Sequence, residues 1–348
     1  MTRVVPPLLR VLAWLVLVLA GTGASHAAGT PWTLQGRTMG TTWHVTLVPT
    51  PGLDRDTAAR GIQARLDRVD GQMSTWKPDS DLSRFNRAPA GTCRRLPPPF
   101  FRVLEHAMDV ARDSGGAYDP TVGPLVDLWG FGPQQRPRRP PSAAAIAAAR
   151  RHVGWQRIRL DATRREACQP GGVHLDLSAV AKGFGVDEVA RWLLAHGAEH
   201  FLVEVGGELR AHGHKPDGNP WRVAVERPGA AAGRVERRDQ VGHVLVPGDR
   251  AVATSGDYRH YFEDADRYYS HHIDPRSGQP VAHRVASVTV VAATAMEADP
   301  LGTTLSVLGP DEGMAFARER GLAVLMIVHG ENGLETLMTP AFEALLAR

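Results

Sequence analysis

Cysteine is scarce in this chain, because its 348 residues contain only two, Cys93 and Cys168. This number excludes a multi-cysteine zinc or iron–sulfur site and any fold that depends on several disulfides. The two residues form either one disulfide in an oxidising compartment or two separate buried thiols, and we assign neither a catalytic role.

Common nucleotide-binding and hydrolase motifs are also absent. The sequence has no Walker loop, no GxGxxG turn after a strand, no GxSxG elbow and no HExxH helix. It has no internal repeat of about 20 to 50 residues either. These absences remove the most frequent mononucleotide, dinucleotide, esterase and zinc-protease interpretations.

A large excess of one charge is lacking as well. Lys+Arg 40 against Asp+Glu 37 gives a net charge of +3, which falls to +1 if Arg3 and Arg10 are removed with the leader described next. Without a long basic run, nucleic-acid binding is not favoured as the main role. With 43% hydrophobic and 22% charged residues, the composition is that of a folded globular protein.

The N-terminus has the pattern of an export signal. Two arginines precede the apolar run 11–20, and small residues follow it up to Ala27. A permanent membrane anchor is the less favoured alternative, since the run is shorter than the roughly 20 residues that span a bilayer, and no cysteine follows it for lipid attachment. We therefore predict a cleaved signal peptide at 1–27, one mature domain at 28–348, and export to the periplasm.

The predicted elements follow one another without a strict alternation. Periodicity predicts strands at 41–48, 173–177, 201–205, 221–226, 244–247, 286–292 and 323–328, and helices at 54–69, 100–112, 143–151, 178–196, 300–308 and 311–319. This order favours an α+β fold with mixed, largely antiparallel sheets and packed helices over a doubly wound parallel sheet. The proline-rich segment 133–141 is predicted to be a surface loop.

The segment 176–187 is the first candidate site, at a predicted junction of strand and helix. A helix N-terminus with a nearby lysine, Lys182, attracts phosphate, whereas the alternative is a capped amphipathic helix with a solvated lysine. Gly183 and Gly185 each cost up to ~1 kcal/mol in a helix interior, which indicates that another group approaches the backbone there.

A second candidate lies around Asp299. This residue could be a helix N-cap with Pro300 at the first helical position. Alternatively, Asp299 and Thr303 are four residues apart and share one helix face, where they offer a carboxylate and a hydroxyl. Oxygen ligands of this kind suit Mg²⁺ better than zinc.

A third candidate contains the adjacent residues His271 and His272, between the segment 254–258 and a turn at 274–278. On an extended segment two adjacent side chains point to opposite sides, so the pair is not expected to bind one metal together. One histidine is a candidate site residue, and the other is interpreted as a surface or core residue.

Further short segments rich in Gly, Asp, Ser and Thr complete a series, at 39–41, 73–76, 81–86, 116–123 and 204–208. In this order, from about Met39 to Leu308, the series resembles the exported ApbE-type FAD:protein FMN transferases. The resemblance implies an ApbE-like α+β fold with a flavin cleft between its lobes. It also implies Mg²⁺-dependent transfer of FMN from FAD to a threonine or serine hydroxyl of an acceptor flavoprotein, through a phosphoester bond and with release of AMP. The acceptors implied are extracytoplasmic FMN-carrying subunits of sodium-pumping NADH:quinone reductases and Rnf-type complexes.

The same resemblance implies roles for individual residues. The residues matched to FAD contacts are Met39, Trp76, Ala117, Tyr118, Asp119, Asp176, Lys182 and Ile273. The matched Mg²⁺ ligands are the carbonyl of Ala179 together with Asp299 and Thr303, whereas Gly302 stands where some members have another aspartate. His271 matches the motif histidine and is predicted to accept or position the proton of the acceptor hydroxyl, with an aspartate base as the alternative.

Two other functions stay open from the sequence. An enzyme with this site but no protein acceptor would be a Mg²⁺-dependent FAD pyrophosphatase that uses water and forms FMN and AMP. If the missing carboxylate at Gly302 abolished metal binding, the chain would be a non-catalytic periplasmic flavin-binding protein.

Overall fold

The computed structural model describes residues 30–347 except 135–138, 228–240, 257–260 and 265–266. The predicted signal peptide, part of the proline-rich segment 133–141 and the end of the segment 254–258 lie outside the described residues. Within the described part, no helix combines the length and the apolar character that crossing a membrane requires.

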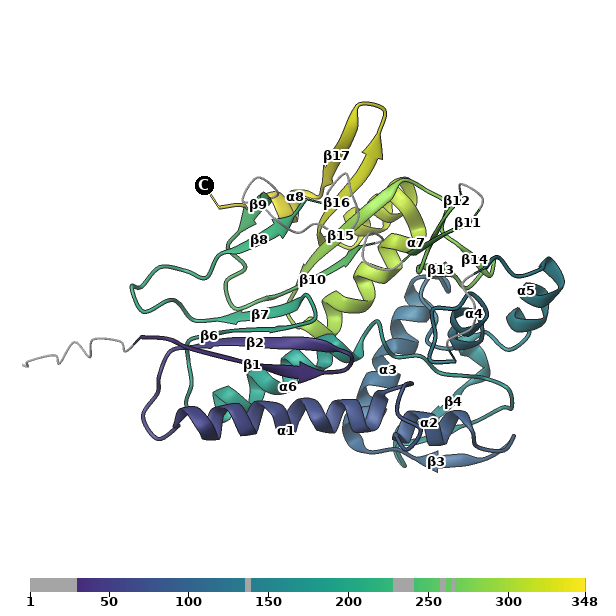
Figure 1. The fold of residues 1–348 in the computed structure, drawn as a ribbon, viewed down its shortest axis with the longest axis horizontal. Helices are drawn as coiled ribbons and strands as arrows, with labels where there is room; N and C mark the ends of the chain where they lie inside the picture. The colour runs from purple at the N-terminus through teal and green to yellow at the C-terminus, as the bar shows by residue number, and fades with distance from the viewer. Residues whose placement is uncertain (1–29, 135–138, 228–240, 257–260, 265–266, 348) are drawn as a thin grey trace, which may run out of the picture.

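A central antiparallel sheet organises the chain (Figure 1). Its eight strands, in their order across the sheet, are β1 (Trp32–Thr38), β2 (Thr41–Leu47), β6 (Phe201–Val205), β7 (Glu208–His212), β10 (Ala251–Gly256), β15 (Val285–Ala292), β16 (Ala323–Gly330) and β17 (Gly333–Met338). Each neighbouring pair is antiparallel. The predicted α+β class is confirmed, although β1, β7, β10 and β17 were not predicted.

The helices lie on the sheet and beside it. They are α1 (Arg55–Met73), α2 (Asp81–Asn86), α3 (Pro98–Asp113), α4 (Gly123–Leu128), α5 (Ala143–Arg150), α6 (Ala181–Ala195), α7 (Ala295–Glu319) and α8 (Pro340–Glu343). Asp54 caps α1 by accepting from the Thr57 N–H, and Ser142 caps α5 as predicted. Helix α6 packs against α1 on one side and α7 on the other (Figure 1).

Both faces of the sheet are covered. Consecutive residues of β10 point to opposite faces, so Ala253 lies in the apolar cluster beneath α7, with Leu305, and Val252 lies in a cluster on the other side. That other cluster includes Phe342 of α8 and residues of a small sheet formed by β8 (Val223–Glu226) and β9 (Val241–Leu245).

A second lobe contains α2 to α5 and a three-stranded sheet of β3 (Cys93–Arg95), β5 (Glu166–Cys168) and β4 (Arg159–Asp161). Cys93 and Cys168 form a disulfide between β3 and β5, which decides the alternative that the sequence left open. Two further pairs of short antiparallel strands are present. One consists of β11 (Tyr261–Asp264) and β12 (Arg267–Ser270), and the other of β13 (Ile273–Asp274) and β14 (Gln279–Pro280).

The predicted strand at 173–177 is wrong. Val173, Leu175 and Leu177 are buried, so the alternating pattern is real. Within the described residues, however, the segment pairs with another strand-like segment only at the isolated bridge between His174 and Val122. The side chain of Asn86 takes the place of a neighbouring strand: its Oδ1 accepts from the Leu175 N–H at 2.8 Å and its Nδ2 donates to the Leu175 carbonyl at 2.9 Å.

The helix boundaries near both site segments also differ from the prediction. Helix α6 begins at Ala181 rather than at 178. Helix α7 begins at Ala295, where Thr294 and Glu297 form a capping box, so the predicted N-cap at Asp299 is wrong. The two helices predicted at 300–308 and 311–319 are arms of α7, which breaks at Gly309, with φ at 80°.

Candidate active site

Three charged side chains meet where α6, β7 and α7 come together. The ammonium Nζ of Lys182 lies 3.4 Å from Glu208 Oε1 and 3.7 Å from Asp299 Oδ1. The Glu208 and Asp299 side chains are only 5% and 4% exposed, whereas Lys182 is 26% exposed. We call these residues the charged triad.

The backbone holds the triad in place at two points. Lys182 Nζ donates to the Ser178 carbonyl at 3.0 Å, in the turn that precedes α6. The Gly183 N–H donates to Asp299 Oδ2 at 3.0 Å, across the contact between α6 and α7. A Cβ on Gly183 would lie 2.2 Å from the Ala295 carbonyl oxygen, so only glycine allows this approach. The close approach predicted at Gly183 is therefore confirmed.

The triad carries one more carboxylate than it has cations, and this shifts its titration. Burial, reinforced by the charge of Asp299, raises the pKa of Glu208 from 4.5 to about 8 despite Lys182. Burial also raises the pKa of Asp299, although Lys182 and the Gly183 N–H oppose this. Burial lowers the pKa of Lys182, but Asp299 and Glu208 outweigh it and raise that pKa above its ordinary value. The lysine therefore stays protonated, and the raised pKa of Glu208 keeps this carboxyl group protonated near neutral pH.

Two buried oxygens, one in the triad and one beside it, lack a hydrogen-bond partner among the described residues. They are Glu208 Oε2 and the Tyr118 hydroxyl. Burial, followed by the charges of Asp299 and Asp176, raises the pKa of Tyr118 well above its usual value, so its hydroxyl stays protonated. Unpaired buried polar groups cost stability, and such groups are frequent where a ligand supplies the missing partner.

The segment around Tyr118 is held rigidly. Asp119 Oδ1 accepts from the N–H and hydroxyl of Thr121 at 2.8 and 2.6 Å, and its Oδ2 accepts from the Trp155 N–H at 3.0 Å. Ala117 is fully buried next to it. Both oxygens of Asp119 therefore have protein partners, so the geometry gives this carboxylate a structural role, and its predicted FAD contact stays a prediction. Asp176 Oδ1 accepts from the Ser178 N–H at 2.8 Å, which shapes the turn before α6.

Met39 is held in an unusual conformation. It is the first residue of the two-residue turn between β1 and β2, with φ at 44°, and Gly40 follows at 73°. Its side chain packs between the cores of the two lobes, near Gly185, where an added Cβ would lie 3.2 Å from the Met39 methyl carbon. A left-handed methionine is strained, and such strain is typical of functional sites. Trp76, in contrast, is 58% exposed on the loop after α1.

Gly302 lies on α7 and contacts β10. A Cβ at this position would lie 2.7 Å from Ser255 Oγ, so a larger residue at 302 requires Ser255 to turn away. Thr303 is half-buried on the same helix, and Ala179 lies partly buried against the core of the second lobe.

The two histidines of the third candidate do not point to opposite sides. Their rings are tilted at 35° with centroids 4.1 Å apart, because the chain bends between β12 and β13 instead of staying extended. His271 also contacts the ring of Phe131 edge-on. His272 is buried, and burial followed by His271 lowers its pKa well below the ordinary value. Ile273 lies in an apolar cluster with Trp129.

Comparison with known proteins decides the family. The model of the ApbE family matches residues 39–326. The chain belongs to the ApbE family.

Relatives and solved structures agree with this assignment. The chain is 40% identical over 318 residues to an FAD:protein FMN transferase of Haemophilus influenzae, covering 90% of both chains. It is 41% identical over 316 residues to the FAD:protein FMN transferase of Vibrio cholerae, covering 90% of this chain and 92% of that protein. The structure of flavin transferase ApbE from Vibrio cholerae superposes with a TM-score of 0.83 at 40% identity, over 91% of this chain and 99% of that one. The apo structure of Pseudomonas stutzeri flavinyl transferase ApbE also gives 0.83 at 40% identity, over 91% and 97%.

From the sequence of this ApbE chain, Glu208 was given no role. The residue lies at the end of the Gly206-Gly207 turn between β6 and β7, and both glycines have positive φ. The available signal was an acidic residue that begins a strand directly after a tight glycine turn. Its two partners in the triad, however, come from distant parts of the chain.

No group of three or more His, Cys, Asp or Glu side chains in the described part is arranged to hold a metal ion. Any metal next to Asp299 would therefore need oxygen donors of other kinds, such as backbone carbonyls and hydroxyls. The donors that the resemblance to the family implies, the Ala179 carbonyl and the Thr303 hydroxyl, are of this type.

Proposed function

We propose that this chain transfers the FMN part of FAD to a hydroxyl of an acceptor protein. The acceptor oxygen attacks the phosphorus on the FMN side of the pyrophosphate, the bond to the AMP oxygen breaks, and AMP leaves with the electron pair. The hydroxyl proton passes to a base. The family membership and the similarity to FAD:protein FMN transferases support this reaction.

The observation that carries the proposal is the charged triad. Lys182 is protonated, partly exposed and positioned by two buried carboxylates, so it presents a fixed positive charge at the surface of the site. Phosphoryl transfer depends mainly on such neutralisation of charge and on alignment of the reacting atoms. We assign Lys182 to the pyrophosphate of FAD. The unpaired Tyr118 hydroxyl and Glu208 Oε2 lie beside it as hydrogen-bonding groups for the ligand.

We further propose that Asp299, Thr303 and the carbonyl of Ala179 hold Mg²⁺. The donor set fits, because it consists only of oxygens and includes the carboxylate of Asp299, whose pKa is raised by burial although Lys182 and the Gly183 N–H oppose this. When bound, Mg²⁺ offsets negative charge on the pyrophosphate. Asp299 would then serve both the metal and the Gly183 N–H, which fixes its orientation.

His271 is our candidate for the group that accepts or positions the acceptor proton. It lies at the bend between β12 and β13, beside Phe131. The flavin contacts proposed for Met39 and Trp76 rest on their packing surfaces: Met39 reaches the junction of the two cores, and Trp76 offers an exposed ring.

We propose export to the periplasm and cleavage after Ala27. The Cys93–Cys168 disulfide supports an oxidising compartment, where such bonds persist. The acceptors we propose are FMN-carrying subunits of NADH:quinone reductases or Rnf-type complexes. N-terminal sequencing of the periplasmic protein tests export, and a retained Met1 would contradict it.

The decisive experiment separates FAD binding from transfer. Wild type, Lys182→Ala and His271→Ala are titrated with FAD and then incubated with FAD, Mg²⁺ and an acceptor, and covalent flavin fluorescence is measured after denaturation. We expect Lys182→Ala to weaken FAD binding, whereas His271→Ala binds FAD but transfers about 10² to 10⁴ times more slowly. His329→Ala, at an exposed histidine on β16, is the matched control and should behave like wild type.

AMP release at the same rate without acceptor, with no acceptor ever labelled, would favour the pyrophosphatase. FAD binding without AMP release would favour the flavin-binding protein.

A further inference from the structure

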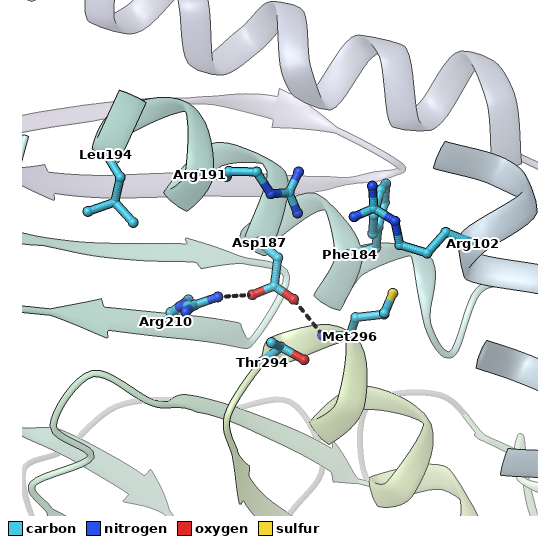
Figure 2. A pocket seen from close by; sticks show the side chains of 8 residues that line it. All are labelled: Arg102, Phe184, Asp187, Arg191, Leu194, Arg210, Thr294 and Met296. Atoms are coloured by element: carbon cyan, nitrogen blue, oxygen red, sulfur yellow. Dashed lines mark hydrogen bonds and ion pairs between the residues drawn. The ribbon is translucent and has the colours of Figure 1, made fainter. Parts of the chain in front are cut away.

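A pocket of about 250 Å³ lies beside α6, lined by residues of α3, α6, β7 and the start of α7 (Figure 2). On α6, Phe184, Asp187 and Arg191 contribute to this pocket and form one stripe of the helix, whereas Lys182 lies on a different stripe. The pocket is therefore separate from the charged triad, although both share the same helix.

Asp187 is the residue that connects the elements around this pocket. Its Oδ1 accepts from Arg210 Nη1 at 2.7 Å and from the Ala295 N–H at 3.2 Å, and its Oδ2 accepts from the Met296 N–H at 2.9 Å (Figure 2). The side chain is only 5% exposed. One carboxylate on α6 thus binds β7 through an arginine and occupies the free N–H groups at the start of α7.

Each element that Asp187 joins also carries one member of the triad. Lys182 lies on α6, and Glu208 lies two residues before Arg210, on the same face of β7. Asp299 lies one helical turn after Ala295 on α7. The two contacts between α6 and α7, from Gly183 to Asp299 and from Asp187 to the start of α7, are themselves one turn apart.

We propose that Asp187 and Arg210 are positioning residues for the active site, because they fix β7 and α7 against α6 and so set the distances from Lys182 to Glu208 and Asp299. The proposal rests on the proposed roles of Lys182 and Asp299. Neither positioning residue is assigned a contact with FAD, the metal or the acceptor. Their effect on the reaction passes through the geometry of the triad.

The test uses Asp187→Asn, Arg210→Met and the conservative Arg210→Lys in the full mature chain. Arg210→Met removes the charge and keeps most of the apolar stem, so it tests the pair even if Asp187→Asn fails to fold. For each variant, FAD affinity is measured by fluorescence in EDTA, and kcat and KM for FMN transfer are measured with Mg²⁺. A misplacement of about 1 Å costs about 10²-fold in rate, so we expect Arg210→Met to weaken metal-free FAD binding and to lower kcat by about 10- to 100-fold. Arg210→Lys should recover much of the FAD affinity and much of kcat.

Thr339→Val is the control for a purely structural effect. Thr339 is 1% exposed, and its hydroxyl accepts from the Val324 N–H at 2.9 Å and donates to the Leu322 carbonyl at 2.7 Å, away from the site. We expect this variant to lower Tm without changing FAD affinity or kcat. If Asp187→Asn and Arg210→Met behave in the same way as Thr339→Val, the positioning role is wrong.

Lys182→Ala, measured in parallel, distinguishes a failure of the proposed active site from a failure of the positioning role. Normal FAD binding and transfer by Lys182→Ala would contradict the proposed site itself. Impaired Lys182→Ala together with fully active Asp187→Asn and Arg210→Met would contradict only the positioning role.

Discussion

Glu208→Gln should make the stability of the metal-free protein less dependent on pH. In the folded wild type the pKa of Glu208 is raised to about 8, mainly by burial, against 4.5 for an unperturbed glutamate. Between these values the folded protein retains a proton that the unfolded chain has lost. Unfolding then releases a proton, so stability decreases as the pH rises.

The size of this pH dependence is set by the release of one proton on unfolding. The free energy of unfolding changes by at most about 1.4 kcal/mol for each pH unit, so the wild type should lose up to about 2.7 kcal/mol between pH 5.5 and pH 7.5 through this group. Glutamine resembles the protonated glutamate in shape and charge, and the Glu208→Gln variant should lack this loss. Because the comparison is between slopes, a constant packing cost of the glutamine does not affect it.

The assay is urea denaturation of both proteins in EDTA at several pH values from 5.5 to 7.5. Glu263→Gln, at an exposed glutamate on β11, is the matched control and should follow the wild-type curve. If the curves of wild type and Glu208→Gln run parallel across this range, the triad does not hold the extra proton, and our account of its electrostatics is refuted.

Three further predictions concern other parts of the chain. Asp299→Asn should reduce FMN transfer by at least about 10²-fold, because it removes the charge that faces Lys182 and the proposed metal; near-normal transfer at limiting Mg²⁺ would contradict the ligand role. Replacing Cys93 and Cys168 by serine should lower stability by about 4 kcal/mol, as expected for a cross-link over 75 residues, and dithiothreitol should then have no additional effect on Tm. Gly302→Ala should lower Tm through its contact with Ser255 Oγ, and Ser255→Ala in the same chain should restore part of the loss; an equal loss in both backgrounds would exclude that contact as the cause.

The central sheet was predictable where a strand alternates between buried and more exposed residues, as in β2 and β6, and where a run of β-branched residues is buried on both faces, as in β15. The same alternation at 173–177 led to a wrong strand, because the Leu175 backbone bonds to a side chain, that of Asn86, 89 residues earlier in the chain, where a neighbouring strand would lie. The periodicity of apolar residues indicates which side chains are buried, but it does not indicate the hydrogen-bond partners of the backbone.

The start of α7 had a local signal that Pro300 concealed. Thr294 and Glu297 have the spacing of a capping box, but a proline is expected at the first helical position, and this placed the predicted N-terminus one turn too late. The resemblance to a known family assigned both Lys182 and Asp299 to the active site. The structure shows these two side chains in contact. Glu208 was given no role in this way, because its place in the triad depends on a contact between three elements that no local pattern describes.

The order in which the chain is made has a consequence for the triad. The bond from Gly183 to Asp299 closes a separation of 116 residues, so the triad exists only after α7 has docked onto α6. A nascent chain that ends before α7 therefore lacks Asp299 and cannot form the complete triad. If FAD binds the triad as proposed, it binds only the finished fold, shifts the folding equilibrium toward that state and so protects the enzyme against unfolding.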